Sequence, residues 1–196
     1  MTRLPQRLIS DNLELRAFSL DYFDDALDAV MESLPDIQMW LWWAQAPLDE
    51  HSYRAFVRSG SENFRIDVEW RYFIFERATN SLVGGCSIDV AASGDRSSAK
   101  VGYWIRTSCT GRNLATQTAR ILTDAAFRFL PSISSVEIGM DIANIASARI
   151  PEKLGFTNVG EFDKPIWATG HTGRGLIWAM SRSDWQRHEF TSTKKR

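Results

Sequence analysis

The spacing of apolar and polar residues changes period several times along the chain, and each change predicts a new element. Residues 13–18 alternate with the period of two that is typical of a strand. Beyond Ser19, which can cap a helix, apolar residues recur at helical spacing as far as Leu34. A second helix is expected over residues 48–57, followed by a polar loop at 59–67.

Three strands are expected next, at residues 70–77, 82–90 and 100–105. The first is rich in aromatic residues, which favour strands. A turn at 78–81 and a loop at 91–98 separate them. Consecutive strands with such short links favour antiparallel pairing.

The last third of the chain mixes helices and strands. A helix begins after Gly111, a strand covers 136–142, and a short helix covers 147–154. A strand–helix–strand order implies a crossover, and hence at least one parallel pair. Strands at 159–168 and 176–181 are expected to form a final hairpin. The fold class that follows is α+β, with a mixed, mostly antiparallel sheet of about seven strands flanked by helices.

Length and composition agree with one globular domain. The 196 residues are 44% hydrophobic and 24% charged, and we expect a single domain over residues 1–190. The polar, basic residues 191–196 are expected to be a disordered tail. The net charge of -1 disfavours a strongly basic, nonspecific nucleic-acid-binding domain.

Membrane, disulfide and metal classes find no support in the sequence. No apolar run approaches the roughly 20 residues that span a bilayer, and no apolar segment follows the N-terminal charges as in a signal peptide. Cys86 and Cys109 make neither a disulfide framework nor a zinc site, so a cytoplasmic protein with free thiols is expected. The three histidines lie far apart, no metal is expected, and His171 is predicted at a surface turn.

Tryptophan is unusually frequent. Three of the eight tryptophans crowd together as Trp40, Trp42 and Trp43. They can fill a core, or they can form an aromatic wall for a flat or apolar substrate.

The segment at residues 106–115 leads from a strand through a glycine turn into a helix. Backbone N–H groups at the start of a helix attract anions, and Arg112 adds a full positive charge. The segment lacks the lysine of a P-loop and the spaced glycines of a dinucleotide fingerprint. By itself it indicates either a simple turn or a phosphate site.

Together with three other stretches, this turn resembles the GNAT acyltransferases, most closely their RimJ/RimL branch. The similar stretches are LELRAFSLD at 13–21, GYWIR at 102–106, TGRNLAT at 110–116 and NIASARIPEKLGF at 144–156. Their order and spacing also agree with the family. In the phosphate turn, Asn113 replaces a usual glycine, and asparagine is among the residues best suited to positive φ.

The resemblance implies that acetyl-CoA is the co-substrate. Its pantetheine arm is expected in a V-shaped opening between the strands at 100–105 and 136–142, with its pyrophosphate on the turn. The residues that this implies for acetyl-CoA binding are Trp104, Ile105, Arg106, Thr110, Gly111, Arg112, Asn113, Leu114, Ala115, Asn144 and Ser147.

The implied chemistry is direct attack of an amine on the thioester. Asn144 is expected to hydrogen-bond the pantetheine, and Ser147 to lie near the leaving sulfur. Lys100, Pro151 and Val159 stand where many relatives carry proton-handling groups, so no base can be transferred from the family.

Position alone makes Asp141 the candidate base, with Glu69 and Asp89 as further candidates. Solvated carboxylates at strand ends are the alternative for all three. The acceptor wall is expected to contain Trp40, Trp43, Glu69, Trp70 and Asp89.

The predicted function is therefore N-acetyl transfer from acetyl-CoA to an amine. An α-amine, with a pKa near 7.7–8.0, is partly neutral at pH 7, whereas a lysine amine is not. A peptide N-terminus, an amino-acid conjugate or a small molecule is accordingly the expected acceptor. The alternatives are an aminoacyl nucleotide or aminoacyl-tRNA, another acyl group, or a CoA-binding module without turnover. No membrane or other nucleic-acid partner is expected, and the protein is predicted to be a monomer or homodimer.

Overall fold

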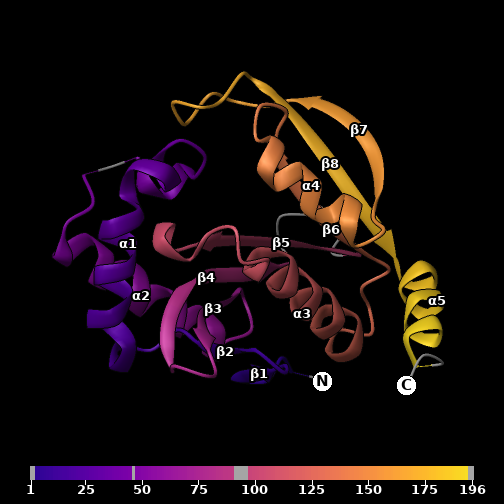
Figure 1. The fold of residues 1–196 in the computed structure, drawn as a ribbon, viewed down its shortest axis with the longest axis horizontal. Coiled ribbons are helices and arrows are strands. Elements are labelled where there is room, and N and C mark those ends of the chain that lie inside the picture. The colour runs from indigo at the N-terminus through magenta and orange to yellow at the C-terminus, as the bar shows by residue number, and fades with distance from the viewer. Residues whose placement is uncertain (1–2, 46, 91–96, 194–196) are drawn as a thin grey trace.

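A computed structural model describes residues 3–45, 47–90 and 97–193. Its centre is one eight-stranded sheet in the order β1-β2-β3-β4-β5-β6-β8-β7 (Figure 1). The strands are β1 (Arg7–Ile9), β2 (Leu13–Ala17), β3 (Trp70–Glu76), β4 (Ser81–Asp89), β5 (Ser98–Ile105), β6 (Ser135–Asp141), β7 (Thr157–Asp163) and β8 (Arg174–Ser181). The helices are α1 (Phe23–Gln38), α2 (Glu50–Arg65), α3 (Leu114–Phe129), α4 (Ile145–Lys153) and α5 (Arg182–Thr193).

The strand pairing confirms the predicted α+β class. Every described pair of neighbouring strands is antiparallel except β5 and β6, which are parallel and are joined through α3. The sheet has one strand more than expected because β1 was not predicted. Three residues are too few to show an alternation, although Leu8 is buried between two exposed neighbours.

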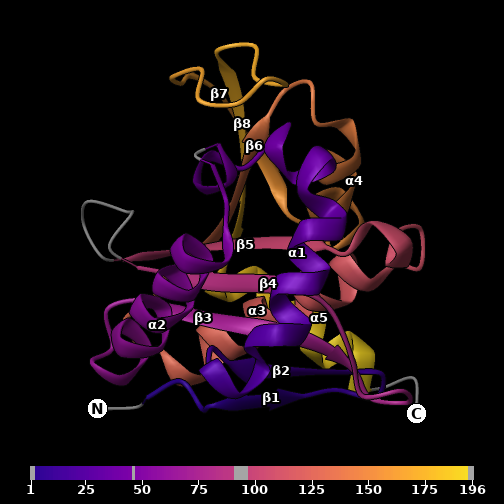
Figure 2. The ribbon, with the colours of Figure 1, turned by 90° about the vertical axis from the view of Figure 1, so that its left-hand side faces the viewer.

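Residues that alternate along β3 supply the two cores on either side of the sheet. Phe73 and Phe75 belong to an apolar cluster with residues of α1 and α2. Tyr72 and Ile74 belong to the cluster that contains the buried face of α3. Figure 2 shows α1 and α2 in front of the strands, with α3 behind them.

Helix α2 is longer than predicted and includes most of the expected loop at 59–67. Asp49 caps it in a reciprocal arrangement with Ser52. Its buried residues recur at helical spacing to the end of the helix, namely Tyr53, Val57, Gly60 and Phe64. The intervening polar residues form the solvent face, so high polarity did not mean an absence of structure here.

The C-terminal end also differs from the expectation. Helix α5 follows β8 directly and continues through Thr193, so the first half of the predicted disordered tail is helical. Trp185 anchors α5 by stacking on Phe127, with ring centroids 5.2 Å apart. The rest of the expected tail, 194–196, and most of the expected 91–98 loop, 91–96, lie outside the described residues.

The sheet opens where β5 and β6 separate. Their pairing covers only Ser98–Lys100 against Ser135–Glu137. Beyond these residues β6 continues along β8, and Figure 1 shows the two halves of the sheet diverging. The opening expected between the strands at 100–105 and 136–142 is therefore present.

Candidate active site

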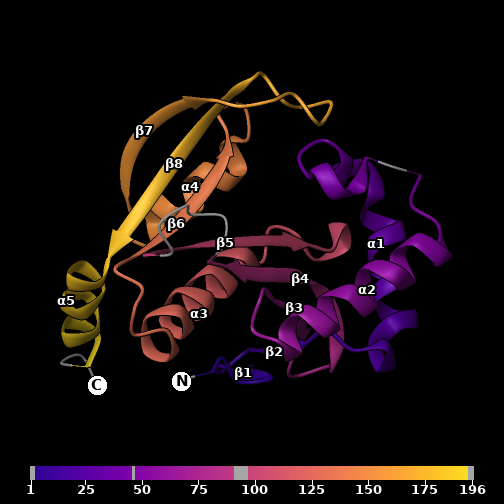
Figure 3. The same ribbon diagram turned by 180° about the vertical axis from the view of Figure 1, so that it is seen from behind.

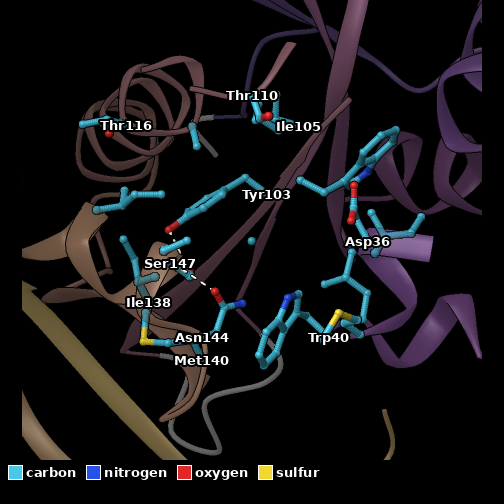
Figure 4. A pocket seen from close by; sticks show the side chains of 18 of the residues that line it. Asp36, Trp40, Tyr103, Ile105, Thr110, Thr116, Ile138, Met140, Asn144 and Ser147 are labelled. Atoms are coloured by element: carbon cyan, nitrogen blue, oxygen red, sulfur yellow. Dashed lines mark hydrogen bonds between the residues drawn. The ribbon is translucent and has the colours of Figure 1, made fainter. Parts of the chain in front are cut away.

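A cavity of about 740 Å³ occupies the opening between β5 and β6 (Figure 4). One end lies at the start of α3 and at α4, where Thr110, Thr116 and Ser147 line it. The other end lies against the end of α1, where Asp36 and Trp40 line it. The cavity thus joins the end expected to hold the cofactor to the end expected to hold the acceptor.

The turn before α3 has the geometry of an anion site. Gly111 has φ +75°, and a Cβ placed there would have no heavy atom within 4 Å, so the turn is open above it. Asn113 adopts φ 61° at the N-cap, as its residue type predicted, and its side chain does not cap the helix. The N–H groups of the first turn therefore have no side-chain cap, and they suit a phosphate group.

Nine of the eleven residues predicted for acetyl-CoA binding line this cavity: Trp104, Ile105, Thr110, Gly111, Asn113, Leu114, Ala115, Asn144 and Ser147. Arg112 and Arg106 are not among the lining residues described. The guanidinium of Arg112 pairs with Glu76 on the other side of the turn. A bound pyrophosphate would therefore compete with Glu76 for Arg112.

Arg106 serves to dock the turn onto α1. It donates hydrogen bonds to Glu32 (2.5 Å) and Asp28 (2.6 Å). Glu32 also accepts from the backbone N of Ser108 at 2.9 Å. The hydrogen bonds from Ser108, and then from Arg106, lower the pKa of Glu32 to about 2. The ionised Glu32 therefore holds the turn in place at neutral pH.

Tyr103, Asn144 and Ser147 meet in the middle of the cavity (Figure 4). The Asn144 side chain caps α4 by accepting from Ser147 N at 3.1 Å. The Tyr103 hydroxyl lies 3.4 Å from Ser147 Oγ. Burial raises the pKa of Tyr103 to about 12, so its hydroxyl stays protonated. Tyr103 was not among the predicted site residues, because the sequence pattern indicated only that it belongs to a strand.

Asp141, at the end of β6, links two segments. Its Oδ1 accepts from Ala143 N at 3.0 Å and from the Thr172 hydroxyl at 2.9 Å, while its Oδ2 accepts from Thr172 N at 2.9 Å. Burial alone would raise its pKa, but these hydrogen bonds and nearby Lys164 lower it overall. A lowered pKa makes a weaker base, so the contacts argue against the predicted catalytic role and favour a structural one.

The acceptor end brings together residues that are remote in the sequence. The segment between β7 and β8 reaches across to the end of α1 (Figure 3), where Gly170 N donates to Met39 O at 3.0 Å. Lys164 and His171 of this segment line the cavity together with Trp40. The predicted turn at His171 is present, since His171 N donates to Ala168 O at 3.0 Å, but the partly buried His171 lines the cavity.

The other predicted acceptor residues do not line this cavity in the described structure. Trp43 stacks on Phe56 with ring centroids 5.3 Å apart, and Glu69 pairs with Arg71 at 2.8 Å. Trp70 is buried in the core behind the sheet, and Asp89 pairs in register with Lys100 at the far end of β4. Trp40 alone of the predicted set reaches the cavity.

Comparison with known proteins gives the family. Residues 12–157 match the acetyltransferase (GNAT) domain. The chain belongs to the GNAT acetyltransferase family. This membership confirms the resemblance and gives the chain the predicted enzyme class, an acyl-CoA-dependent N-acetyltransferase.

Individual relatives are distant. The chain is 28% identical over 117 residues to YjcK of Bacillus subtilis, named as an N-acetyltransferase; the match covers 60% of this chain and 64% of YjcK. It is 21% identical to YdaF of the same organism, named as a ribosomal N-acetyltransferase, over 91% of this chain and 96% of YdaF.

Among solved structures, the fold is similar to RimL, the ribosomal L7/L12 alpha-N-protein acetyltransferase, in complex with coenzyme A. The TM-score is 0.79 at 21% identity, over 92% of this chain and 98% of RimL.

The described residues also bear on metal binding and on membrane insertion. Among the described residues, no group of three His, Cys, Asp or Glu side chains is arranged to hold a metal ion. None of the helices in the described part of the chain has the length and apolar character needed to cross a bilayer.

Proposed function

We propose that the protein transfers an acetyl group from acetyl-CoA to the α-amine of a polypeptide. The observation that carries the proposal is the single cavity that runs from the turn at Gly111 to the end of α1. An acetyl donor held on the turn would present its thioester near Ser147, and an amine could reach it from the side of Trp40. RimL, which has the same fold, carries the name of an α-N-protein acetyltransferase.

The acid–base character of the cavity supports an α-amine over a lysine amine. Its two described carboxylates are Asp36 and Asp141. Asp36 is exposed and accepts from the Thr107 hydroxyl at 2.5 Å, whereas Asp141 has a lowered pKa. Neither suits the deprotonation of a lysine ammonium, whose pKa is about 10.4. An α-ammonium loses its proton to water readily near neutral pH.

The residues have the following roles in this proposal. The N–H groups from Thr110 to Ala115 bind the pyrophosphate. The open edge of β5 at Trp104 and Ile105 pairs with the pantetheine, and a backbone N–H there stabilises the oxyanion. The hydroxyl of Ser147, in contact with Tyr103, donates a hydrogen bond to the departing sulfur. Holding both reactants in one cavity supplies much of the remaining rate enhancement.

The test is a thiol-release assay with acetyl-CoA and matched acceptors. One peptide has a free α-amine with its lysine blocked, and the other has a blocked N-terminus with a free lysine. We expect kcat/KM at pH 7 to be at least tenfold higher for the α-amine peptide, since about 1 in 10 α-amines but only about 1 in 2500 lysine amines is neutral there.

Equal values, or a preference for the lysine peptide, would contradict the choice of acceptor. Binding of acetyl-CoA without thiol release from any amine would instead identify a CoA-binding module without turnover.

A further inference from the structure

Lys164 is a mostly buried lysine at the acceptor end of the cavity. Its side chain is only 16% exposed, and it lines the same cavity as Trp40 and Asp36. Lysine is seldom buried to this extent, and here the one anion beside it among the described ion pairs is Asp141. Its two nearest polar neighbours explain its state.

The first neighbour is His171, whose ring has a defined tautomer. Its Nδ1 accepts a hydrogen bond from Trp167 N at 3.3 Å, so that nitrogen carries no hydrogen. The ring proton therefore sits on Nε2, which lies 3.0 Å from the acceptor Trp40 O and 3.3 Å from Lys164 Nζ. An Nε2–H cannot accept a hydrogen bond from an ammonium. This side of Nζ therefore favours a neutral amine.

The second neighbour is Asp141, whose Oδ2 lies 3.9 Å from Nζ. That separation is too long for a hydrogen bond but close enough to stabilise a charge. Burial lowers the pKa of Lys164, and Asp141 partly offsets this effect. The His171 Nε2–H and burial thus both favour the neutral amine, and Asp141 stabilises the ammonium once it forms.

Other charged groups nearby are accounted for. Asp163 and Glu161 on β7 both pair with Arg174 at 2.8 Å, and the remaining titratable residues that line the cavity are Asp36, Tyr103, Cys109 and Lys153. Asp36 belongs to α1 and accepts from Thr107. The groups that act on the Lys164 amine are therefore the Nε2–H of His171 and the carboxylate of Asp141.

We propose that Lys164 is the proton acceptor for the attacking amine, with Asp141 as the positioning residue that stabilises the resulting ammonium. This inference rests on the proposed function and adds the base that the sequence did not reveal.

The acetyl transfer moves one proton from the acceptor amine to Lys164. The lone pair of the neutral acceptor amine forms the new C–N bond at the thioester carbonyl. The surplus proton on that nitrogen passes to neutral Lys164 Nζ. The C–S bond breaks and its electron pair stays on sulfur, where the Ser147 hydroxyl donates a hydrogen bond to the departing thiolate. Water in the cavity mouth then carries the proton from the Lys164 ammonium to the thiolate, which regenerates neutral Lys164 and releases CoA as the thiol.

Two substitutions separate a base from a structural cation. Lys164→Arg places a permanent positive charge beside Asp141 and cannot release its proton in the working range of pH, whereas Lys164→Met places no ionisable group there. If Lys164 is the base, both variants lose about 100-fold or more in kcat and keep the acetyl-CoA KM within about twofold. If Lys164 only pairs with Asp141, Lys164→Arg retains kcat within about threefold, which would overturn the proposal.

A matched control and a direct titration complete the test. Lys153→Met changes the lysine at the opposite end of the cavity, and it is expected to raise the acetyl-CoA KM without changing the shape of the pH–rate profile. NMR of lysine-labelled protein should show one ammonium, absent in Lys164→Met, that titrates below the usual 10.4. A normal or raised value would also overturn the proposal, and the unsubstituted protein supplies this result even if a variant fails to fold. Native protein that acetylates no amine would refute the proposed function instead.

Discussion

The hydroxyl oxygen of Tyr103 lies 3.4 Å from Ser147 Oγ, and this contact joins β5 to α4 across the cavity. It closes the gap between the two halves of the sheet at one point. Since Asn144 also binds the backbone of Ser147, the serine is held from two sides. Its hydroxyl is therefore oriented before a substrate arrives.

Removing either hydroxyl of this pair should slow the reaction without weakening acetyl-CoA binding. Tyr103→Phe keeps the ring that packs in the cavity, so we expect kcat to fall about threefold to tenfold, the value of one hydrogen bond, with the acetyl-CoA KM unchanged. Ser147→Ala should cost more, because it removes the hydrogen-bond donor to the departing sulfur. In the double variant the two losses should not multiply, since Tyr103 acts through Ser147. Fully multiplicative losses in steady-state kcat would show that the two act independently.

Gly111 offers a test of the phosphate turn. Acetyl-CoA at millimolar concentration should raise the Tm of the native protein, because a ligand that binds only the folded state stabilises it. Gly111→Glu places a carboxylate where the pyrophosphate would bind and should abolish this shift.

Gly160→Glu is the matched control for Gly111→Glu. Both glycines have positive φ and open space at the Cβ position, but only Gly111 lines the cavity. The control variant should lose some stability yet keep the ligand-induced shift in Tm. A shift in Tm that Gly111→Glu retains in full would mean that the turn is not the phosphate site.

The two neighbouring tryptophans Trp40 and Trp43 should behave differently. Trp43→Ala removes a ring stacked on Phe56 and near Trp104, so we expect the free energy of unfolding to fall by about 3 kcal/mol. Trp40→Ala changes the cavity wall and should chiefly raise the acceptor KM. Urea unfolding and steady-state kinetics of both variants distinguish the two effects. If Trp43→Ala instead raised the acceptor KM and left the stability unchanged, Trp43 would belong to the acceptor wall, as the sequence predicted.

Acid should destabilise the fold through two glutamates. Hydrogen bonds from Arg7 and Arg16 lower the pKa of Glu14 to about 2, and those from Ser108 and Arg106 do the same for Glu32. A carboxylate with a lowered pKa in the folded state stabilises it above the ordinary value of 4.5, and this contribution is lost as the pH falls toward about 2.

Urea unfolding at a series of pH values should therefore show decreasing stability from about pH 5 to pH 2. Glu14→Gln and Glu32→Gln should each be less stable at pH 7 and show a flatter dependence on pH. A dependence identical to that of the native protein in both variants would place the acid-sensitive groups elsewhere.

The sequence by itself determined most of the strands, helices and turns, because these depend on residues that are close together in the sequence. Alternation and helical spacing predicted most strands and helices, because burial of one face imposes those periods directly. The turn at Gly111 and Asn113 was also readable, since few residue types adopt positive φ easily and both are present there. The order of strands around α3 required a parallel pair, and the resemblance to the GNAT family predicted the opening beside it.

Only the tertiary structure decided which side chains face that opening. Lys164 and His171 reach Trp40 because the β7–β8 connection folds back over the end of α1, and no local pattern encodes that contact. Arg112 turns to Glu76, and Trp43 turns to Phe56, for the same reason. The direction of a side chain is set by the partners that surround it in space, and those partners come from distant parts of the chain.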